Sequence, residues 1–302
     1  MVNERTPQIT THAKKRQISG FLFVLPVVTY FALIYYVPLI NSFAMSFTEI
    51  LPGQVVEFAG LDTYREVLAT DAFWESVRNT LLFNGISLLL VIPFGIIIAI
   101  ALSNISNGTA RNMFTALYIL PIFVSFAAAG AIWEWIYHPH YGVINNALAA
   151  IGGPRFSFLT GTDQVIPSLA VVNFWVRVGY CILIILSGLQ SIPQSYFEAA
   201  KVDGATGLKL YRRITLPLLL PQIAVVTLLE VIFGFKAFDV VYVTTQGGPA
   251  RASYVILFYF YDNAFRFYRQ DRASVVAVLM FLTLLLFSII QRRVVKGRRY
   301  EL

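Results

Sequence analysis

The chain has 302 residues, of which 57% are hydrophobic and 13% are charged, against about 25% charged in a typical soluble domain. This composition argues against an ordinary soluble protein and favours one that is embedded in a lipid bilayer. The net charge of +7 is accounted for by basic segments at a membrane surface, so it gives no reason to expect a nucleic-acid partner.

Six stretches of the chain are apolar and long enough to cross a membrane as helices, which takes about 20 residues each. They lie at residues 18–45, 81–102, 113–137, 166–189, 218–243 and 273–291. The sequence therefore predicts an all-α, polytopic membrane protein with six transmembrane helices. We expect a terminal segment at 1–17, one bundle domain at 18–291 and a basic tail at 292–302.

The first apolar stretch follows a basic segment, as the apolar part of a secretory signal does. It is too long for such a signal and lacks a cleavage site of small residues, so we expect it to remain as a span. An even number of spans puts both termini on one side, and most Lys and Arg residues lie on that side. Basic residues are retained in the cytoplasm, which places both termini and the polar segment 190–217 there.

The end of the third predicted span carries residues that could be mistaken for a metal site. His138 and His140 are separated by a proline and have no third Cys or His nearby, and the only cysteine, Cys181, lies inside the fourth span. We therefore expect no bound metal. Glu134, between two tryptophans, is typical of the membrane interface, because Trp marks the depth of the headgroups.

Charged residues inside the fourth and fifth spans indicate a solute pathway, because charges within a membrane usually face a protein interior or a water-filled cavity. Polar groups beside an aromatic ring suit a hydroxylated sugar. Residues spaced to share a helix face, together with the neighbouring charges, give the candidate set Asn173, Arg177, Tyr180, Glu230, Phe233, Gly234, Lys236 and Asp239. The alternative is structural: Arg177 would pair with Glu230, and Lys236 with Asp239.

The segment 190–217 is polar although the spans around it are apolar. Pro193 disfavours helical geometry at Ile192, and Ser195 can cap a new helix over residues 196–202. Asp203-Gly204 would end that helix, because glycine tolerates a left-handed conformation. A second short helix over 208–214 would follow before Pro217 opens the fifth span. The pattern predicts a helix-turn-helix along the cytoplasmic face, which suits either docking of a partner or simple interfacial anchoring.

Two further segments lie on the opposite side of the predicted membrane. "FDVVYVTTQGGPARAS" at 238–253 follows the fifth span, and "FAGLDTYREVL" follows the first span from Phe58. The aromatic stretch 255–268 is too interrupted by polar residues to span, so we expect a helix that lies on the outer membrane face.

These motifs together resemble the membrane subunits of bacterial ATP-binding-cassette (ABC) importers. The EAA motif of that family is matched at Glu198, Ala199, Ala200, Gly204, Ile214, Leu216 and Pro217, with Asp203 inside the same loop. The T-x-G-G-P of its sugar permeases is matched at Thr245 and residues 247–249. Its F-x-G-L-x-N-Y is matched from Phe58, except that Thr63 replaces Asn.

The resemblance implies a type I ABC importer permease in a bacterial inner membrane, with a cytoplasmic coupling helix that follows the ATPase. It implies as partners a second, related permease, two ATPase subunits that bind ATP and Mg²⁺, and an extracytoplasmic solute-binding protein. The solute would be an oligosaccharide or related polyhydroxy compound, neutral or acidic, and the family's solute site lies on the fourth and fifth spans.

No catalytic motif supports an enzyme. "LSGLQ" at 186–190 approaches the ATPase signature L-S-G-G-Q, but it ends a span, and the chain contains no G-x-x-x-x-G-K-[ST] loop. We therefore expect no cofactor on this chain and ATP hydrolysis on separate subunits. Two alternatives stay open from the residues: an ion-coupled secondary transporter that uses the buried charges, and a membrane-embedded enzyme or scaffold.

Overall fold

The computed structural model describes residues 9–51, 53 and 55–296; most of the predicted segment 1–17 is included, whereas residues 1–8 and the end of the basic tail, 297–302, lie outside the described part. Helices dominate it, in agreement with the expected fold class. The N-terminal third contains α1 (Ile9–Phe31), the π-helical turn η1 (Ala32–Tyr36), α2 (Val37–Met45), β1 (Thr48–Leu51), β2 (Val55–Phe58), α3 (Asp62–Leu68) and α4 (Asp71–Ser103).

The middle and C-terminal parts are helical as well. The middle contains α5 (Gly108–Ile119), the 3-10 turn η2 (Leu120–Phe123), α6 (Phe126–Ile136), α7 (Val143–Ala150), α8 (Val165–Ser191) and α9 (Gln194–Val202). The C-terminal part contains α10 (Gly207–Leu210), the π-helical turn η3 (Tyr211–Thr215), α11 (Leu216–Leu218), α12 (Leu220–Phe235), α13 (Asp239–Thr244), α14 (Ile256–Tyr261), the π-helical turn η4 (Asp262–Arg266) and α15 (Gln270–Lys296).

Four continuous stretches of helix in the described part are long and apolar enough to cross a membrane: 19–45, 71–103, 165–191 and 270–295. The third and fifth predicted spans are instead bent pairs, with angles of 102° between 108–123 and 126–136 and of 68° between 207–218 and 220–244. Six spans result only if each bent pair counts as one. The first bend follows local sequence, since Pro121 lies in η2 and Ser125 caps α6 by accepting from Ala128 N–H.

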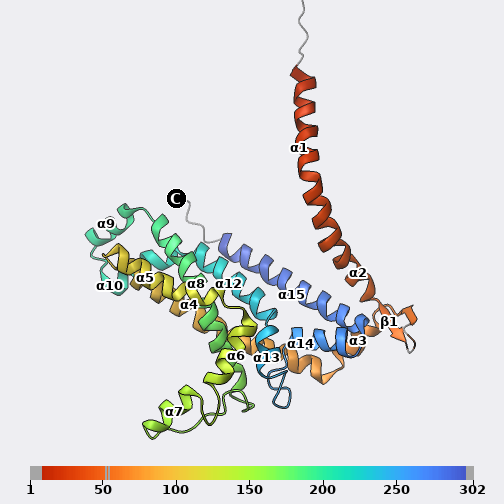
Figure 1. The fold of residues 1–302 in the computed structure, drawn as a ribbon. Coiled ribbons are helices and arrows are strands. Elements are labelled where there is room, and N and C mark those ends of the chain that lie inside the picture. Colours follow the sequence, from red (N-terminus) through yellow and green to blue (C-terminus); the bar gives the residue numbers. More distant parts are fainter. Residues whose placement is uncertain (1–8, 52, 54, 297–302) are drawn as a thin grey trace, which may run out of the picture.

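The core is built around α8, which packs along α4 and is crossed by α12 (Figure 1). One buried cluster joins α8 to α4 and α13 and includes Phe83, Leu169 and Val241. A second lies nearer the end of α8 that leads to α9 and includes Val91, Ile185 and Leu219. The central helices α4, α8 and α12 therefore form one body that connects the α9 end to the loops at the opposite end.

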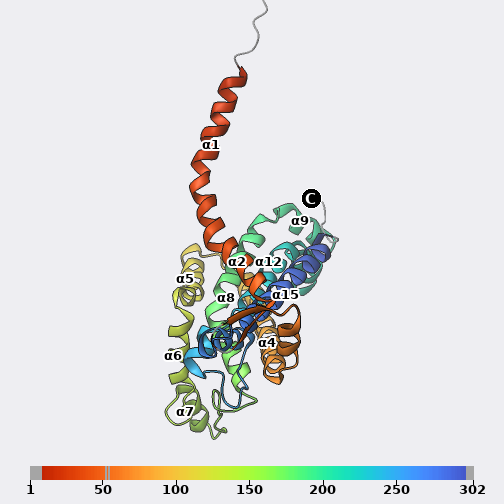
Figure 2. The ribbon, with the colours of Figure 1, turned by 90° about the vertical axis from the view of Figure 1, so that its right-hand side faces the viewer.

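The first helix stands away from this body (Figures 1 and 2). In the most apolar window of 19–45, no residue is buried within the chain. Only its last part, α2, packs on α15. An apolar helix exposed on all sides requires lipid or the helices of another subunit around it.

The hairpin β1–β2 was not expected from the sequence, because two four-residue strands are too short to give a clear alternating pattern. The strands are antiparallel, with Ile50 opposite Val56. Ile50 is buried, whereas Val56 and Phe58 are exposed. The hairpin therefore adds a small β element to a fold that was predicted to be all-α.

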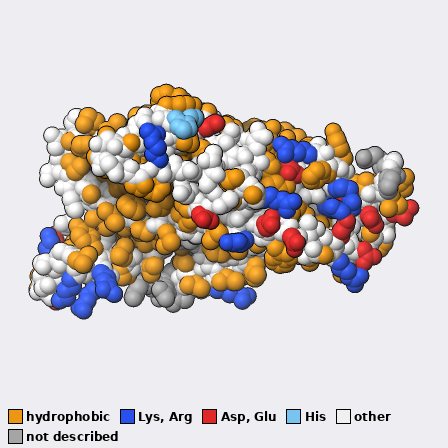
Figure 3. Space-filling model, turned by 90° about the horizontal axis from the view of Figure 1, so that it is seen from below, with side chains coloured by type: hydrophobic (Ala, Val, Ile, Leu, Met, Phe, Trp, Pro, Cys, Tyr) orange, Lys and Arg blue, Asp and Glu red, His pale blue; other side chains and the backbone are white. Residues whose placement is uncertain are grey.

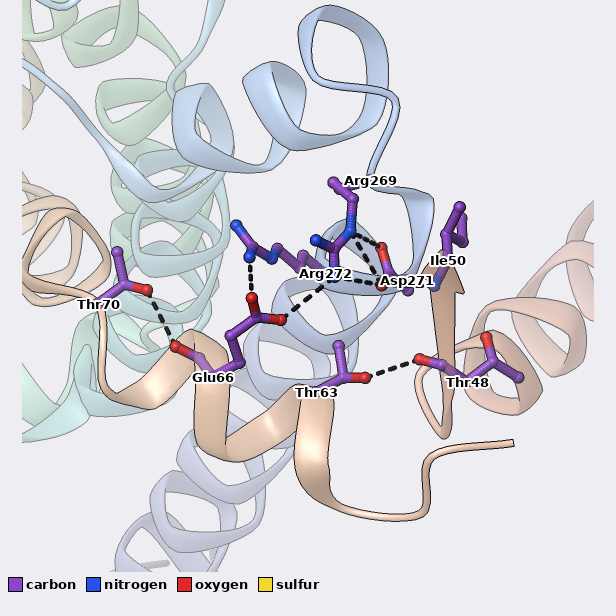
Figure 4. Close-up of polar contacts among 8 residues, drawn as sticks. All are labelled: Thr48, Ile50, Thr63, Glu66, Thr70, Arg269, Asp271 and Arg272. Atoms are coloured by element: carbon purple, nitrogen blue, oxygen red, sulfur yellow. Dashed lines mark hydrogen bonds and ion pairs between the residues drawn. The ribbon is translucent and has the colours of Figure 1, made fainter. Parts of the chain in front are cut away.

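A polar cluster, which we call the hairpin clamp, fastens this hairpin and α3 to the start of α15 (Figure 4). It consists of Glu66, Arg269, Asp271 and Arg272. Asp271 is fully buried and accepts from the Ile50 backbone N–H at 3.0 Å and from Arg269 at 2.8 Å. Glu66 pairs with Arg269 at 3.2 Å and with Arg272. The hairpin and α3, which follow each other in the sequence, are thus held to the distant start of α15 by one connected set of charges.

The aromatic stretch 255–268 forms the expected helix, α14 followed by η4. Part of this helix is packed inside the protein, whereas the sequence predicted a helix on the outer membrane face. Phe258 and Tyr259 are buried, and α14 packs against both α4 and α15. Burial and the Asp262 carboxylate, which accepts from the Tyr254 hydroxyl at 2.7 Å, raise the pKa of Tyr254. The tyrosine therefore stays protonated and acts as a fixed hydrogen-bond donor at the base of this helix.

Candidate functional site

A cavity of about 200 Å³ lies between α4, α8 and the end of α12. It is lined by Phe83, Phe126, Asn173, Arg177, Phe233, Lys236, Ala237, Phe238, Asp239 and Val240. Five of the eight residues predicted for the solute pathway are among them. The cavity combines four aromatic rings with charges of both signs, a lining that suits an amphipathic solute.

Glu230 lies just behind this cavity and is almost completely buried, with 1% of its surface exposed. Its Oε2 accepts from Asn173 Nδ2 at 3.3 Å, which connects it to the cavity wall. Its Oε1 has no hydrogen-bond partner within the described part of the chain. A buried carboxylate oxygen without a partner is energetically costly, so this site has unused hydrogen-bonding capacity.

Arg177 lies against aromatic rings rather than against a carboxylate. Its guanidinium carbon is 3.4 Å from the centroid of the Phe233 ring and 4.8 Å from that of Phe126. Its Nε, like Glu230 Oε1, has no partner among the described residues. Cation–π contact can hold the guanidinium in place while leaving its N–H groups for a ligand.

The structural alternative for these charges is not realised. Across the described residues, the ion pairs include neither Arg177 with Glu230 nor Lys236 with Asp239, at a limit of 4.0 Å between nitrogen and oxygen. Lys236 and Asp239 are both exposed at the end of α12 and the start of α13. The charges are therefore separate groups around the cavity.

Tyr180 and Gly234 do not line the cavity but position its walls. The Tyr180 hydroxyl donates to the Val226 carbonyl at 3.2 Å, and its ring lies edge-on to Phe233 with centroids 6.1 Å apart. Gly234 packs directly on the Asn84 side chain, and a Cβ added there would overlap the Asn84 amide. This contact sets how closely α12 approaches α4.

Replacing Gly234 with alanine is expected to destabilise the protein by about 1–3 kcal/mol, because the added methyl group must displace the buried Asn84 side chain. Gly85→Ala is the matched control, since a Cβ at Gly85 on α4 meets nothing within 4 Å. Thermal unfolding of both purified variants measures the difference. Equal melting temperatures for the two would contradict this role of Gly234.

The polar segment 190–217 forms the expected helix-turn-helix, with differences in detail. Ile192 is extended, as predicted before proline, but α9 begins at Gln194 with Pro193 at its N-cap, so Ser195 does not cap it. Gly204 adopts the expected left-handed conformation, with φ of +73°. The Ala205 N–H closes the turn by donating to the Ala200 carbonyl at 2.8 Å.

The second half of the segment is less regular than predicted. The expected helix over 208–214 is divided between α10 and η3, and Pro217 lies in α11, before a break at Leu219. The long helix α12 therefore starts at Leu220 rather than at Pro217. Leu219 is fully buried in the cluster with α8, and Tyr211 accepts from Asn104 at 3.0 Å, so this end is anchored to the bundle.

The residues of the EAA motif divide into two groups by exposure. Glu198, Ala199 and Asp203 are exposed, whereas Ala200 is buried and Ile214, Leu216 and Pro217 are half-buried. The exposed apolar side chains of the segment stand at its tip, with Val202 87% and Leu208 82% exposed. The first group and these two side chains form a surface that projects from the bundle.

Comparison with known proteins identifies the chain's relatives. Residues 91–300 match the model of the binding-protein-dependent transport system inner membrane components. The chain belongs to this family. It is 30% identical to the trehalose/maltose transport system permease protein MalF of Thermococcus litoralis, over 96% of this chain and 98% of that protein. ATP hydrolysis in such importers is done by separate ATPase subunits, so the prediction of a permease that is not itself an enzyme is confirmed.

Solved structures agree with this membership. A crystal structure of a bacterial ABC transporter involved in the import of the acidic polysaccharide alginate contains a similar chain, 25% identical, with a TM-score of 0.83 over 96% of this chain and 99% of that one. Another, of an alginate ABC transporter with an alginate pentasaccharide-bound periplasmic protein, is 26% identical, with a TM-score of 0.80 over 92% of this chain and 93% of that one. These comparisons give no support to the ion-coupled alternative.

The sequence analysis predicted Phe233 but missed the other three aromatic rings of the cavity, which come from α4, α6 and the segment after α12. Phe83 and Phe126 have no charged neighbour in the sequence that would single them out, whereas Phe238 stands beside the predicted Asp239 and was overlooked. Arg177 could have indicated that aromatic rings lie around the cavity, because a buried cation needs either a carboxylate or aromatic faces around it.

Proposed function

We propose that the chain is a sugar permease that passes its solute through the cavity between α4, α8 and α12. The observation that carries the proposal is a pair of unused buried polar atoms: Arg177 Nε, on a guanidinium that lies against the Phe233 ring, and Glu230 Oε1, behind the cavity wall at Asn173. A pyranose has hydroxyl groups at its edges and an apolar face. The hydroxyls can bond to the charged groups while the face stacks on aromatic rings.

The solute is an oligosaccharide or related polyhydroxy compound, and both neutral and acidic sugars fit. Arg177 and Lys236 can pair with the carboxylate of an acidic sugar. When the solute is neutral, Glu230 and Asp239 can balance the positive charges of Arg177 and Lys236. The relatives cover the same range, since one is a trehalose/maltose permease and another takes part in alginate import.

Uptake into proteoliposomes tests this function. The complete complex, with ATP inside and its binding protein outside, is expected to take up trehalose, maltose or an alginate oligosaccharide. Uptake should stop without ATP and should persist with a protonophore. Uptake that the protonophore abolishes while ATP remains would overturn the proposal in favour of an ion-coupled carrier.

Arg177→Ala is expected to reduce uptake at least about tenfold, because it removes a charged donor that no other described residue uses. Copurification of the ATPase subunits should be unchanged, since Arg177 lies far along α8 from α9. Arg111→Ala, on α5 outside the cavity, is the control. Loss of assembly in Arg177→Ala would show instead that the residue is structural.

The segment 190–217 is proposed to be the coupling loop, which docks on an ATPase subunit. Its supports are the exposed apolar tip, Val202 and Leu208, and the fixed turn at Gly204. ATP and Mg²⁺ would bind to two such subunits. When they close on ATP, the loop follows, and α12 and α8 move with it, because the loop joins these two helices directly.

The remaining partners are proposed on the same grounds. The exposed helix α1 would pack on a second, related permease and on lipid, and an extracytoplasmic binding protein would deliver the solute. At the end of the molecule with α9 and α10, Lys and Arg predominate over the exposed Glu198 and Asp203, whereas the opposite end shows both signs mixed (Figure 3). This asymmetry supports cytoplasmic termini in a bacterial inner membrane.

A further inference from the structure

A second cavity, of about 470 Å³, lies at the end of the bundle opposite the coupling loop, and we call it the entry chamber. It is bounded by the first turns of α4, the loop before α8 and the loop between α13 and α14. Its polar lining consists of Glu75, Arg78, Asn79, Thr162, Asp163 and Arg251. Its volume falls in the range of small-molecule sites, roughly 300–1,000 Å³.

The wall of the entry chamber is fixed by buried hydrogen bonds. Asn79, only 9% exposed, donates to the carbonyls of Arg251 at 2.9 Å and Tyr254 at 3.2 Å. Thr80 Oγ accepts from the Ile256 N–H at 2.8 Å, and Glu75 pairs with Arg251 at 3.3 Å. The loop that closes one side of the chamber is thus held in place before any ligand binds.

The chemistry of the lining matches that of the cavity of about 200 Å³ between α4, α8 and α12, which we call the membrane cavity. Its charges are of both signs, and Arg78 forms no ion pair within the described part of the chain. Leu82 and Pro167 supply apolar surface beside these groups. Polar edges and an apolar face are again what a sugar ring presents.

The two cavities share α4 and α8 as walls. On α8 the chamber is lined at Pro167 and the membrane cavity at Asn173, six residues further along, or about 9 Å. On α4 the neighbours Leu82 and Phe83 line one cavity each. Phe83 and Val240, both 1% exposed, line the membrane cavity and belong to the same buried cluster as Ile166, which lines the chamber. We call this shared cluster the apolar layer.

We propose that the entry chamber is a second sugar-binding subsite, which the solute occupies before the apolar layer opens toward Arg177. This inference rests on the proposed function. It assigns Arg78 and Asp163 as hydrogen-bonding groups for the sugar, outside the membrane cavity. A docking place for the binding protein itself is the competing use of these residues, and the test separates the two.

Protection of an introduced cysteine measures occupancy directly. Leu82→Cys places a thiol at the chamber wall, and the chain's single native cysteine, Cys181, is fully buried and gives little background. The complete complex in lipid nanodiscs, without binding protein, is labelled with a thiol reagent in the presence of trehalose, maltose or an alginate oligosaccharide. Val56→Cys on the hairpin, with similar exposure, is the control.

The sugar that the complex takes up is expected to slow labelling of Leu82→Cys at least threefold and to leave Val56→Cys unchanged. Adding Arg78→Ala should raise the sugar concentration needed for protection by about tenfold, as for the loss of one charged hydrogen bond. The labelling rate without sugar should stay the same, which a merely structural role of Arg78 would not predict.

The outcomes separate the chamber from the function on which it rests. If the complex takes up one of the sugars but that sugar does not protect Leu82→Cys, the chamber is not a subsite and the proposed function stands. In a parallel sample with sugar-free binding protein in place of sugar, protection of Leu82→Cys would make these residues a docking surface and overturn the proposal. If the complex takes up none of the three, the sugar class fails and the chamber proposal fails with it.

Discussion

Gly204→Val is expected to abolish ATP-driven uptake while the chain still folds and inserts. Gly204 has φ of +73°, a region in which a β-branched side chain is a genuine outlier. Valine would push this residue out of the left-handed region and break the turn that the Ala205 N–H closes on the Ala200 carbonyl. Val202 and Leu208 would then no longer project together, and the docking surface that we propose for the ATPase would be lost.

Gly204→Asn is the matched control, because asparagine tolerates the left-handed conformation far better than valine. A Cβ at Gly204 meets nothing within 4 Å in the isolated chain, so neither variant is expected to disturb the bundle. We expect copurified ATPase and uptake near wild-type levels for Gly204→Asn, and a loss of at least about tenfold for Gly204→Val. If asparagine is as damaging as valine, the backbone argument is wrong and the partner subunit excludes any side chain there.

The sequence predicted features that depend on local patterns. The helix break at Ile192, the left-handed Gly204 and the approximate position of α9 follow from proline and glycine chemistry that acts within a few residues. Family membership was also accessible, because the motif around Glu198 is contiguous in sequence. The apolar stretches located the four continuous candidate spans, and the third and fifth stretches correspond to the two bent pairs, since burial in lipid imposes the same composition on any helix that crosses it.

Features that depend on contacts between distant segments were not accessible. Phe126 reaches Arg177 only because α6 folds back at a bend of 102°, and no pattern in either segment indicates that angle. Gly234 was predicted to face the solute, but the close approach of Asn84 assigns it to helix packing. Helical periodicity shows which residues share a face and does not show what that face contacts.

The second large effect is expected from a substitution in the hairpin clamp. Asp271→Ala is expected to destabilise the protein by about 3 kcal/mol, because removing the buried partner of an ion pair leaves the remaining charge with less compensation. Asp271 is fully buried, and its loss removes partners from both Arg269 and the Ile50 N–H. Breaking a buried ion pair costs about 3–5 kcal/mol. We take the low end of this range because Arg269 keeps its contact with Glu66. Thermal unfolding of the purified variant measures the change.

Arg65→Ala is the control for the clamp, since it also removes one partner of an ion pair close by on α3. The pair of Arg65 with Asp62 is 79% and 70% exposed, and exposed pairs contribute little, so the melting temperature should not change. Asp271→Asn separates charge from hydrogen bonding, because its carbonyl can still accept from Ile50 while the attraction to Arg269 is lost. An intermediate melting temperature is expected for it, together with normal resistance of the hairpin to proteolysis. If Asp271→Ala melts like Arg65→Ala, the hairpin is held by apolar packing at Ile50 and not by the clamp.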